Sequence, residues 1–259
     1  MEWAVSACVA GKRALEGAMR VYVLDGFVTE HVDIAREVSE LYRRVAQHEP
    51  DAARREAMRQ RRYALLEPLR VALTAQAYAD LRAALAFELG EIAMEAVEHK
   101  ELRAAELVES HAARSARKLR SAGVWRDRGV DAFDDFCTLC RAQLVKPPAE
   151  KGGPGIVESV AEFEQDRLGP YLRAQFYAAR LVGRALLDER TRVASIKASL
   201  QRFEACALDA RLALAKPRGA SPLPQDFFRD ELRICDEMRD LLPEKINQSH
   251  YKGRNLDAI

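Results

Sequence analysis

Two cysteines, Cys137 and Cys140, have the spacing shared by zinc sites and thiol redox sites. A structural zinc ion needs about four ligands, and the sequence has no second cysteine pair at this spacing and no matched histidine pair. Redox pairs of this kind begin a helix beside a strand, whereas Cys137 and Cys140 fall inside a helical pattern. We therefore expect two small side chains buried in a helical core, with no bound metal.

Four glutamates, Glu88, Glu91, Glu95 and Glu98, follow one another at steps of three and four, and such carboxylates could bind metal in a helical bundle. Di-metal bundles need a Glu-x-x-His sequence on each of two helices, and none of the five histidines has a glutamate at that spacing. The histidines are scattered, and none pairs with a serine or cysteine as base and nucleophile. We interpret the four glutamates as a solvated helix face.

Residues 152–155, Gly-Gly-Pro-Gly, could suggest a loop that holds a phosphate group. The segment lacks a preceding strand and the Lys-Ser/Thr ending of such loops, and proline removes an N–H donor. It is better interpreted as a linker. The sequence thus predicts no catalytic residue, no cofactor and no metal site, and we expect a protein that is not an enzyme.

The strongest local charge bias is cationic and lies within about three helical turns. The members of this arginine stripe are Arg54, Arg55, Arg59, Arg61 and Arg62. All except Arg61 are our candidates for contact with an acidic partner surface. The alternative is a solvated helix neutralised by Glu56, Glu67 and neighbouring helices. An unpaired guanidinium is too costly to bury, so we expect Arg59→Glu with Arg62→Glu to leave folding nearly intact.

The arginine stripe belongs to a predicted helical hairpin over residues 24–69. Its first helix has apolar residues at steps of three and four, namely Val28, Val32, Ala35, Val38, Tyr42 and Val45. Residues 48–51 form the turn, and the second helix runs from Asp51 to Glu67. Pro68 is expected to end it, because proline lacks the N–H and clashes with the preceding turn.

Two runs in this hairpin, LDGFVTEHVDI from Leu24 and RREAMRQRRYALLEPL from Arg54, resemble the C-terminal half of the KIF-binding protein family, the kinesin-binding proteins. Weaker similarity continues in residues 168–170, 176–183 and 241–245. Known members are much longer and have an N-terminal helical-repeat half that this chain lacks. We expect a missing upstream helical segment or a partner to cover the first helix.

The rest of the chain also has helical patterns, giving about nine helices in successive antiparallel pairs. We expect helices over 101–122, ended by Gly123, and over 127–145, a helix starting near Pro170, and a last helix over 228–242. Residues 146–155 and 216–224, rich in proline and glycine, should form exposed, mobile loops, and residues 243–259 a polar tail. The prediction is a single all-α domain over 1–259; the resemblance implies a TPR-like α-solenoid of helix hairpins.

Composition restricts the class of partner. The chain has 259 residues, with 41 Lys and Arg against 40 Asp and Glu, so global charge does not favour nucleic acid. The first apolar run is interrupted at residues 11–13, short of the roughly 20 residues that span a bilayer, and no signal peptide is evident. Five cysteines, an odd number, are typical of reduced thiols in the cytoplasm.

The resemblance implies a non-enzymatic interaction protein that binds kinesin motor domains and blocks their attachment to microtubules. It also implies a cytoskeletal location and a role in organelle transport. The alternative from another class is a structural scaffold, a helical subunit of a larger assembly with no motor partner.

Overall fold

The computed structural model describes residues 2–107, 112–142, 165–184, 189–215, 223–224 and 226–256. Within these ranges all regular elements are helices, and no strand is present. The helices are α1 Glu2–Val21, α2 Val28–His48, α3 Ala52–Ala72, α4 Ala75–Leu107, α5 Ala112–Ala142, α6 Gln165–Val182, α7 Glu189–Ala215 and α8 Arg229–Leu256. The all-α prediction is confirmed for these described ranges. None of the helices described there is both long enough and apolar enough to cross a bilayer.

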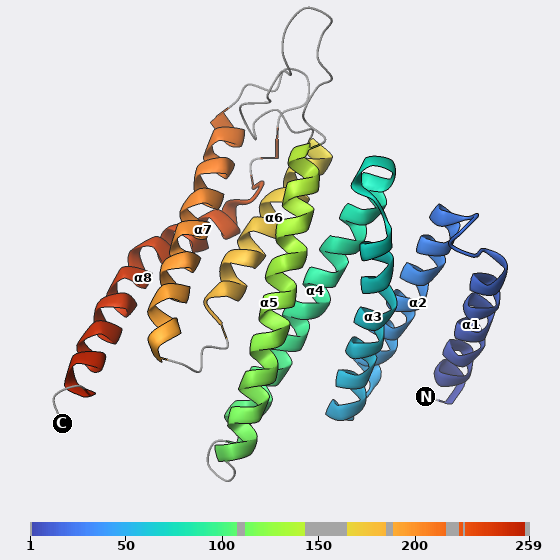
Figure 1. Cartoon of the computed structure of the whole chain (residues 1–259), viewed down its shortest axis with the longest axis horizontal. Helices are drawn as coiled ribbons and strands as arrows, with labels where there is room; N and C mark the ends of the chain where they lie inside the picture. Colours follow the sequence, from blue (N-terminus) through green and yellow to red (C-terminus); the bar gives the residue numbers. More distant parts are fainter. Residues whose placement is uncertain are drawn as a thin grey trace, which may run out of the picture.

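The helices lie side by side in chain order, from α1 at one end of the molecule to α8 at the other (Figure 1). Each of them packs against the next in the sequence, and α6 also contacts α4 and α8. Long-range contacts of the chain are therefore mostly between sequence neighbours.

The long helices α4 and α5 form the centre of the row, and two glycines set their separation. A Cβ atom on Gly90 would lie 2.5 Å from the ring of Phe133, and one on Gly129 would lie 2.7 Å from Leu181 and 3.0 Å from Ala93. Real Cβ atoms essentially never lie under 3.0 Å from another heavy atom. The absence of a side chain at Gly90 thus allows α4 and α5 to approach closely, and at Gly129 it leaves room for Leu181 of α6.

Aromatic rings connect the centre of the molecule to its C-terminal helices. Phe87 of α4 contacts Phe133 of α5 at 5.8 Å between ring centroids, and Phe133 contacts Tyr177 of α6 at 5.6 Å. Phe176 of α6 then contacts Phe203 of α7 at 5.9 Å. Such pairs contribute about 0.5–1.5 kcal/mol each beyond the area that they bury. This core fixes the positions of α4, α5 and α6, which form part of the site described below.

The predicted hairpin is confirmed as α2 and α3, joined by residues 49–51. Val32 of α2 and Leu66 of α3 are completely buried, as the apolar spacing requires. Asp51 caps α3, since its carboxylate accepts hydrogen bonds from the backbone N–H of Ala53 at 2.7 Å and of Arg54 at 3.2 Å.

Two predicted helix ends are wrong. Pro68 does not end α3, which continues to Ala72; only one backbone hydrogen bond is lost there, while Leu69 in the same turn is buried. Gly123 does not end a helix either, because α5 passes through it. Continuation of α5 brings Trp125 against Tyr63 of α3, with ring centroids 5.0 Å apart.

The predicted last helix is also too short. It was expected to end at residue 242, but α8 runs from Arg229 to Leu256 with Pro243 inside it. Leu242 and Ile246 are both buried on either side of the proline. Burial of this face on two successive turns stabilises the helix against the one missing hydrogen bond.

Two further boundaries differ from prediction. The predicted helices over 101–122 and 127–145 are divided differently in the described ranges, where residues 101–107 belong to α4 and residues 112–142 form α5. The described ranges hold eight helices, whereas about nine were expected. Pro170 lies inside α6, which already includes Gln165. Residues 146–155 and 216–222 lie outside the described residues, and the predicted loops there stay predictions; residues 223–224 have no regular structure.

Candidate partner-binding groove

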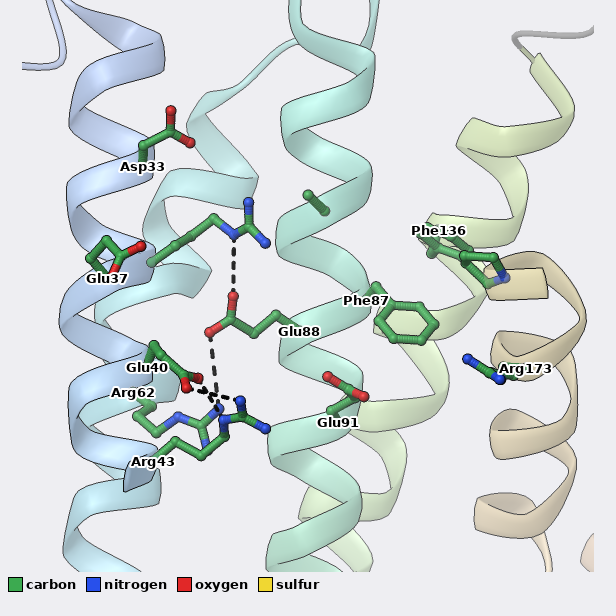
Figure 2. Close-up of a pocket in the computed structure, with 13 residues that line it drawn as sticks. Asp33, Glu37, Glu40, Arg43, Arg62, Phe87, Glu88, Glu91, Phe136 and Arg173 are labelled. Carbon is green, nitrogen blue, oxygen red and sulfur yellow. Dashed lines mark hydrogen bonds and ion pairs between the residues drawn. The ribbon is translucent and has the colours of Figure 1, made fainter. Parts of the chain in front are cut away.

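A groove of ≈ 730 Å³ lies over α2, α4, α5 and α6, with one side chain of α3 at its wall (Figure 2). We call it the acidic groove. Its lining residues are Asp33, Arg36, Glu37, Glu40, Arg43, Arg62, Ala84, Phe87, Glu88, Glu91, Phe136, Pro170 and Arg173. The groove combines a charged wall on α2 with an apolar wall on α4 and α5.

The charged wall is fixed by an ion-pair network around Glu88, which projects from α4 toward α2 (Figure 2). Glu88 accepts hydrogen bonds from Ser39 at 2.6 Å and from Arg36 at 3.3 Å. Arg62 of α3 lies below it, with its side chain only 4% exposed and its Nη2 atom 3.9 Å from Glu88. Arg62 also donates to Ser39 at 3.1 Å and to Glu95 at 3.3 Å.

Glu40 is neutralised within its own helix. Its carboxylate accepts hydrogen bonds from Arg43 at 2.6 Å and from Arg44 at 2.8 Å. The bond from Arg43 is the main reason that the pKa of Glu40 is lowered to about 2. Glu40 and Arg43 therefore add little net charge to the groove.

Three other carboxylates of the groove have no ion-pair partner among the described residues, namely Asp33, Glu37 and Glu91. Asp33 and Glu37 are exposed on α2. Glu91 is half-buried on α4, and burial, together with the nearby charges of Glu95 and Glu88, raises its pKa. The lining holds five carboxylates against four arginines, and one of these, Arg173, lies 3.9 Å from Glu231 outside the groove, so the groove carries a small excess of negative charge.

The opposite wall is apolar and aromatic. Phe87 of α4 and Phe136 of α5 pack edge to face with centroids 5.1 Å apart. Ala84 and Pro170 extend this wall toward α6. A segment that combines an apolar face with basic side chains would complement both walls.

Two of the four candidate arginines lie at the start of α3. The side chain of Arg54 is 72% exposed, and its nearest carboxylate is Glu49 at 3.7 Å. Arg55 donates to the backbone carbonyls of Glu49 at 2.7 Å and of Pro50 at 2.9 Å. Whether Arg54 and Arg55 contact a partner stays a prediction.

The other two arginines contact carboxylates of this chain. Arg59 is 13% exposed and lies 3.7 Å from Glu95, and Arg62 belongs to the network around Glu88. Arg62 thus does not present its guanidinium to the solvent. The candidate arginines do not form one surface, because α3 directs Arg54 outward and Arg62 into the contact with α2 and α4.

The solvated-face interpretation of the four glutamates of α4 is wrong for Glu88, whose side chain is 16% exposed, whereas those of Glu95 and Glu98 are 40% and 41% exposed. Glu88 and Glu95 face the arginines of α2 and α3, and Glu98 pairs with Arg184, two residues after the end of α6, at 2.9 Å and with Arg180 of α6 at 3.6 Å. Their spacing of three and four was visible in the sequence, but their partners lie on other helices, far away in the chain. Sequence reasoning therefore missed the acidic groove.

The cysteine pair lies within α5, where Cys140 is buried and Cys137 half-buried. Burial raises the pKa of the Cys140 thiol to about 11 and raises that of Cys137 as well. Such thiols are poor nucleophiles at neutral pH. Within the part of the chain that the structure describes, no three His, Cys, Asp or Glu side chains gather as metal ligands.

Comparison with known proteins gives a family match over nearly the whole chain. The family model described as "KIF-1 binding protein C terminal" matches residues 4–248. The KIF-binding protein of Gallus gallus is 26% identical over 247 residues, which are 94% of this chain and 37% of the relative. That of Danio rerio is 27% identical over 248 residues, 95% of this chain and 36% of the relative.

The human relative shows the same relation. The KIF-binding protein of Homo sapiens is 26% identical over 246 residues, which are 93% of this chain and 35% of the relative. The chain thus spans little more than a third of the length of the curated relatives that it matches. No solved structure matches the chain.

Proposed function

The chain belongs to the family of the KIF-1 binding protein C-terminal region, and we propose that it is a non-enzymatic protein that binds kinesin motor domains. The observation that supports this proposal is the acidic groove, in which Asp33, Glu37 and Glu91 lack an ion-pair partner among the described residues beside an apolar wall. A binding surface of this kind requires a partner with basic and apolar side chains rather than a small substrate.

The fold that we propose for this role is a TPR-like α-solenoid of helix hairpins. Contacts mainly between successive helices support it, since in solenoids each repeat packs on its neighbours. Such folds offer extended surfaces for protein partners. The proposed unit is one helical-repeat domain over residues 1–259.

The unpaired carboxylates suit a basic segment of the motor domain. Complementary charge accelerates encounter and selects the partner, and apolar contacts then slow dissociation. We propose that the bound segment belongs to the tubulin-binding side of the motor. Binding would then compete with microtubule attachment and regulate organelle transport, in the cytoplasm and at the cytoskeleton.

The alternative function is that of a structural scaffold subunit without a motor partner. The row of helices would serve either role. The two are distinguished by whether the surface charge of the groove affects binding of a motor domain, because a scaffold has no need of unpaired carboxylates at this place.

The test is the affinity of the purified chain for kinesin motor domains, measured by isothermal titration calorimetry with wild type and Asp33→Asn with Glu37→Gln. Both residues are exposed, so folding should be unchanged. We expect binding to weaken by about tenfold, equivalent to ~1.4 kcal/mol, and to become less sensitive to salt.

A matched control is Glu204→Gln with Glu244→Gln. These exposed glutamates of α7 and α8 do not line the groove, and their substitution changes net charge by the same amount. Equal affinity of the groove variant and wild type would contradict the proposed site. Absence of motor binding by the wild-type chain would favour the scaffold.

A further inference from the structure

A second pocket, of ≈ 380 Å³, lies beside the acidic groove where α2, α3 and α4 meet. We call it the Arg59 pocket. Its polar lining includes Arg43, Arg55, Arg59, Glu95, Glu98 and His99. Arg43 lines the acidic groove as well, so the two sites share a wall.

The Arg59 pocket contains polar atoms whose hydrogen-bonding capacity is unused. Nη1 of Arg59 and both ring nitrogens of His99 are buried and have no hydrogen-bond partner. A buried donor left without an acceptor costs about 1–3 kcal/mol, and more when it is charged. Arg59 and the one N–H group of a neutral His99 are donors, and they therefore favour a ligand that carries acceptor oxygens.

The carboxylates of the pocket already have other partners. Glu95 is shared between Arg59 at 3.7 Å and Arg62 at 3.3 Å. Glu98 lies 2.9 Å from Arg184, just after α6, and 3.6 Å from Arg180 of α6. Arg55 donates only to backbone carbonyls and has no carboxylate partner among the described residues. Positive charge in the pocket is therefore incompletely neutralised.

The pKa of His99 also reflects the positive charge in the Arg59 pocket. Burial lowers the pKa of His99, and the positive charges of Arg59 and Arg55 lower it further. The pKa of Arg59 is also lowered, mainly by burial, although Glu95 opposes this. A neutral His99 still offers one N–H donor.

We propose that the Arg59 pocket binds a small oxyanion, such as a phosphate, sulfate or carboxylate group, between Arg55, Arg59 and His99. Planar guanidinium groups bind such anions through paired N–H···O bonds. The anion would join α3 to α4 and so stabilise the helix contact beside the acidic groove. This site does not depend on a kinesin partner.

Calorimetric titration tests the proposal with sodium sulfate, sodium phosphate and sodium succinate, each at constant ionic strength maintained with sodium chloride. We expect one saturable site in the wild-type chain. Arg59→Gln should weaken it by about tenfold or more, since a bond to a charged group is lost. Preference for succinate over the inorganic anions would identify a carboxylate as the bound group, and the reverse preference a phosphate or sulfate.

Arg54→Gln is the matched control, because it removes the same charge from the same helix at a residue that does not line the pocket. Its affinity should stay within about twofold of wild type, since only screened long-range charge is changed. No saturable binding of any of the three anions, or equal weakening in Arg54→Gln and Arg59→Gln, would overturn the proposal.

A measurement on the wild-type chain keeps the test independent of the folding of Arg59→Gln. Sulfate should shift the imidazole NMR signals of His99, assigned with His99→Gln, and bind more tightly as pH falls from 8 to 5.5, because a bound anion favours protonated His99. Unchanged His99 signals at saturating sulfate would refute the site. The other charged groups around His99 are Arg43 of α2, Arg55, Glu56 and Arg59 of α3, and Glu95, Glu98 and Lys100 of α4.

Discussion

Replacement of Arg62 by methionine should destabilise the protein strongly. The side chain is 4% exposed and lies 3.1 Å from Ser39, 3.3 Å from Glu95 and 3.9 Å from Glu88. Methionine keeps the apolar stem but removes the charge. Loss of one partner from a buried ion pair costs about 3–5 kcal/mol, because the remaining charge is left uncompensated.

The expected cost here is somewhat smaller. Glu88 keeps its bonds from Arg36 and Ser39, and the side chain of Glu95 is 40% exposed and keeps Arg59 nearby. We therefore expect Arg62→Met to lower the free energy of unfolding by about 2–4 kcal/mol. In a chain of this size a loss of about 3 kcal/mol lowers Tm by about 6–12 °C.

Thermal unfolding followed by circular dichroism measures this change. Arg61→Met is the control, because the neighbouring Arg61 is exposed and its loss should cost about 0–1 kcal/mol. Addition of Glu88→Gln to Arg62→Met should recover part of the stability, since the unpaired charge is then removed. Equal Tm values for Arg62→Met and Arg61→Met would refute the network. The expectation that Arg59→Glu with Arg62→Glu leaves folding intact is replaced by this prediction.

Three further predictions concern packing, pH and thiol reactivity. Gly90→Ala should lower the free energy of unfolding by about 1–3 kcal/mol, because its Cβ would meet Phe133. Gly17→Ala, which has nothing within 4 Å of its Cβ, should stabilise α1 by about 0.5–1 kcal/mol. A higher Tm for Gly90→Ala than for wild type would contradict the close contact. The pKa of Glu40 is lowered from 4.5 to about 2, so its ion pairs should stabilise wild type over Glu40→Gln above pH 4.5 and lose this effect as pH falls toward 2. Chemical denaturation at pH 7 and pH 2.5 measures the difference in free energy of unfolding between the two proteins. The same difference at both pH values would disprove the assignment. Cys140, which is buried and has a pKa of about 11, should react with iodoacetamide at pH 8 much more slowly than Cys8. Mass spectrometry of the alkylated peptides shows which cysteine is labelled first. Faster labelling of Cys140 than of Cys8 would exclude its burial.

The helical class and the first hairpin were predictable from the sequence, because their signals are local. The apolar steps from Val28 to Val45 predict one face of α2, and Asp51 before α3 supplies a recognisable cap. Helix ends were less predictable where tertiary packing overcomes a local breaker. At Pro68, Gly123 and Pro243 the helix continues, and in each case buried apolar side chains lie close to the breaker in the same helix.

The acidic groove could not be predicted from the sequence alone. Its network joins Arg36, Arg62 and Glu88, which lie on three different helices. Spacing along one helix shows which residues share a face but not which charges oppose them on the next. For this reason the sequence predicts an exposed arginine stripe, although Arg62 is buried, and a solvated glutamate face, although Glu88, Glu95 and Glu98 pair with arginines far away in the chain.

Competition between this chain and microtubules for a kinesin motor domain tests the central proposal most directly. Motor domain bound to microtubules is sedimented with increasing amounts of the wild-type chain, of Asp33→Asn with Glu37→Gln, and of the control Glu204→Gln with Glu244→Gln. We predict that the wild-type chain and the control release the motor into the supernatant and that the groove variant needs about tenfold more protein for the same release. Motor that stays with the microtubules at saturating wild-type chain, or equal release by all three proteins, would contradict binding through the acidic groove.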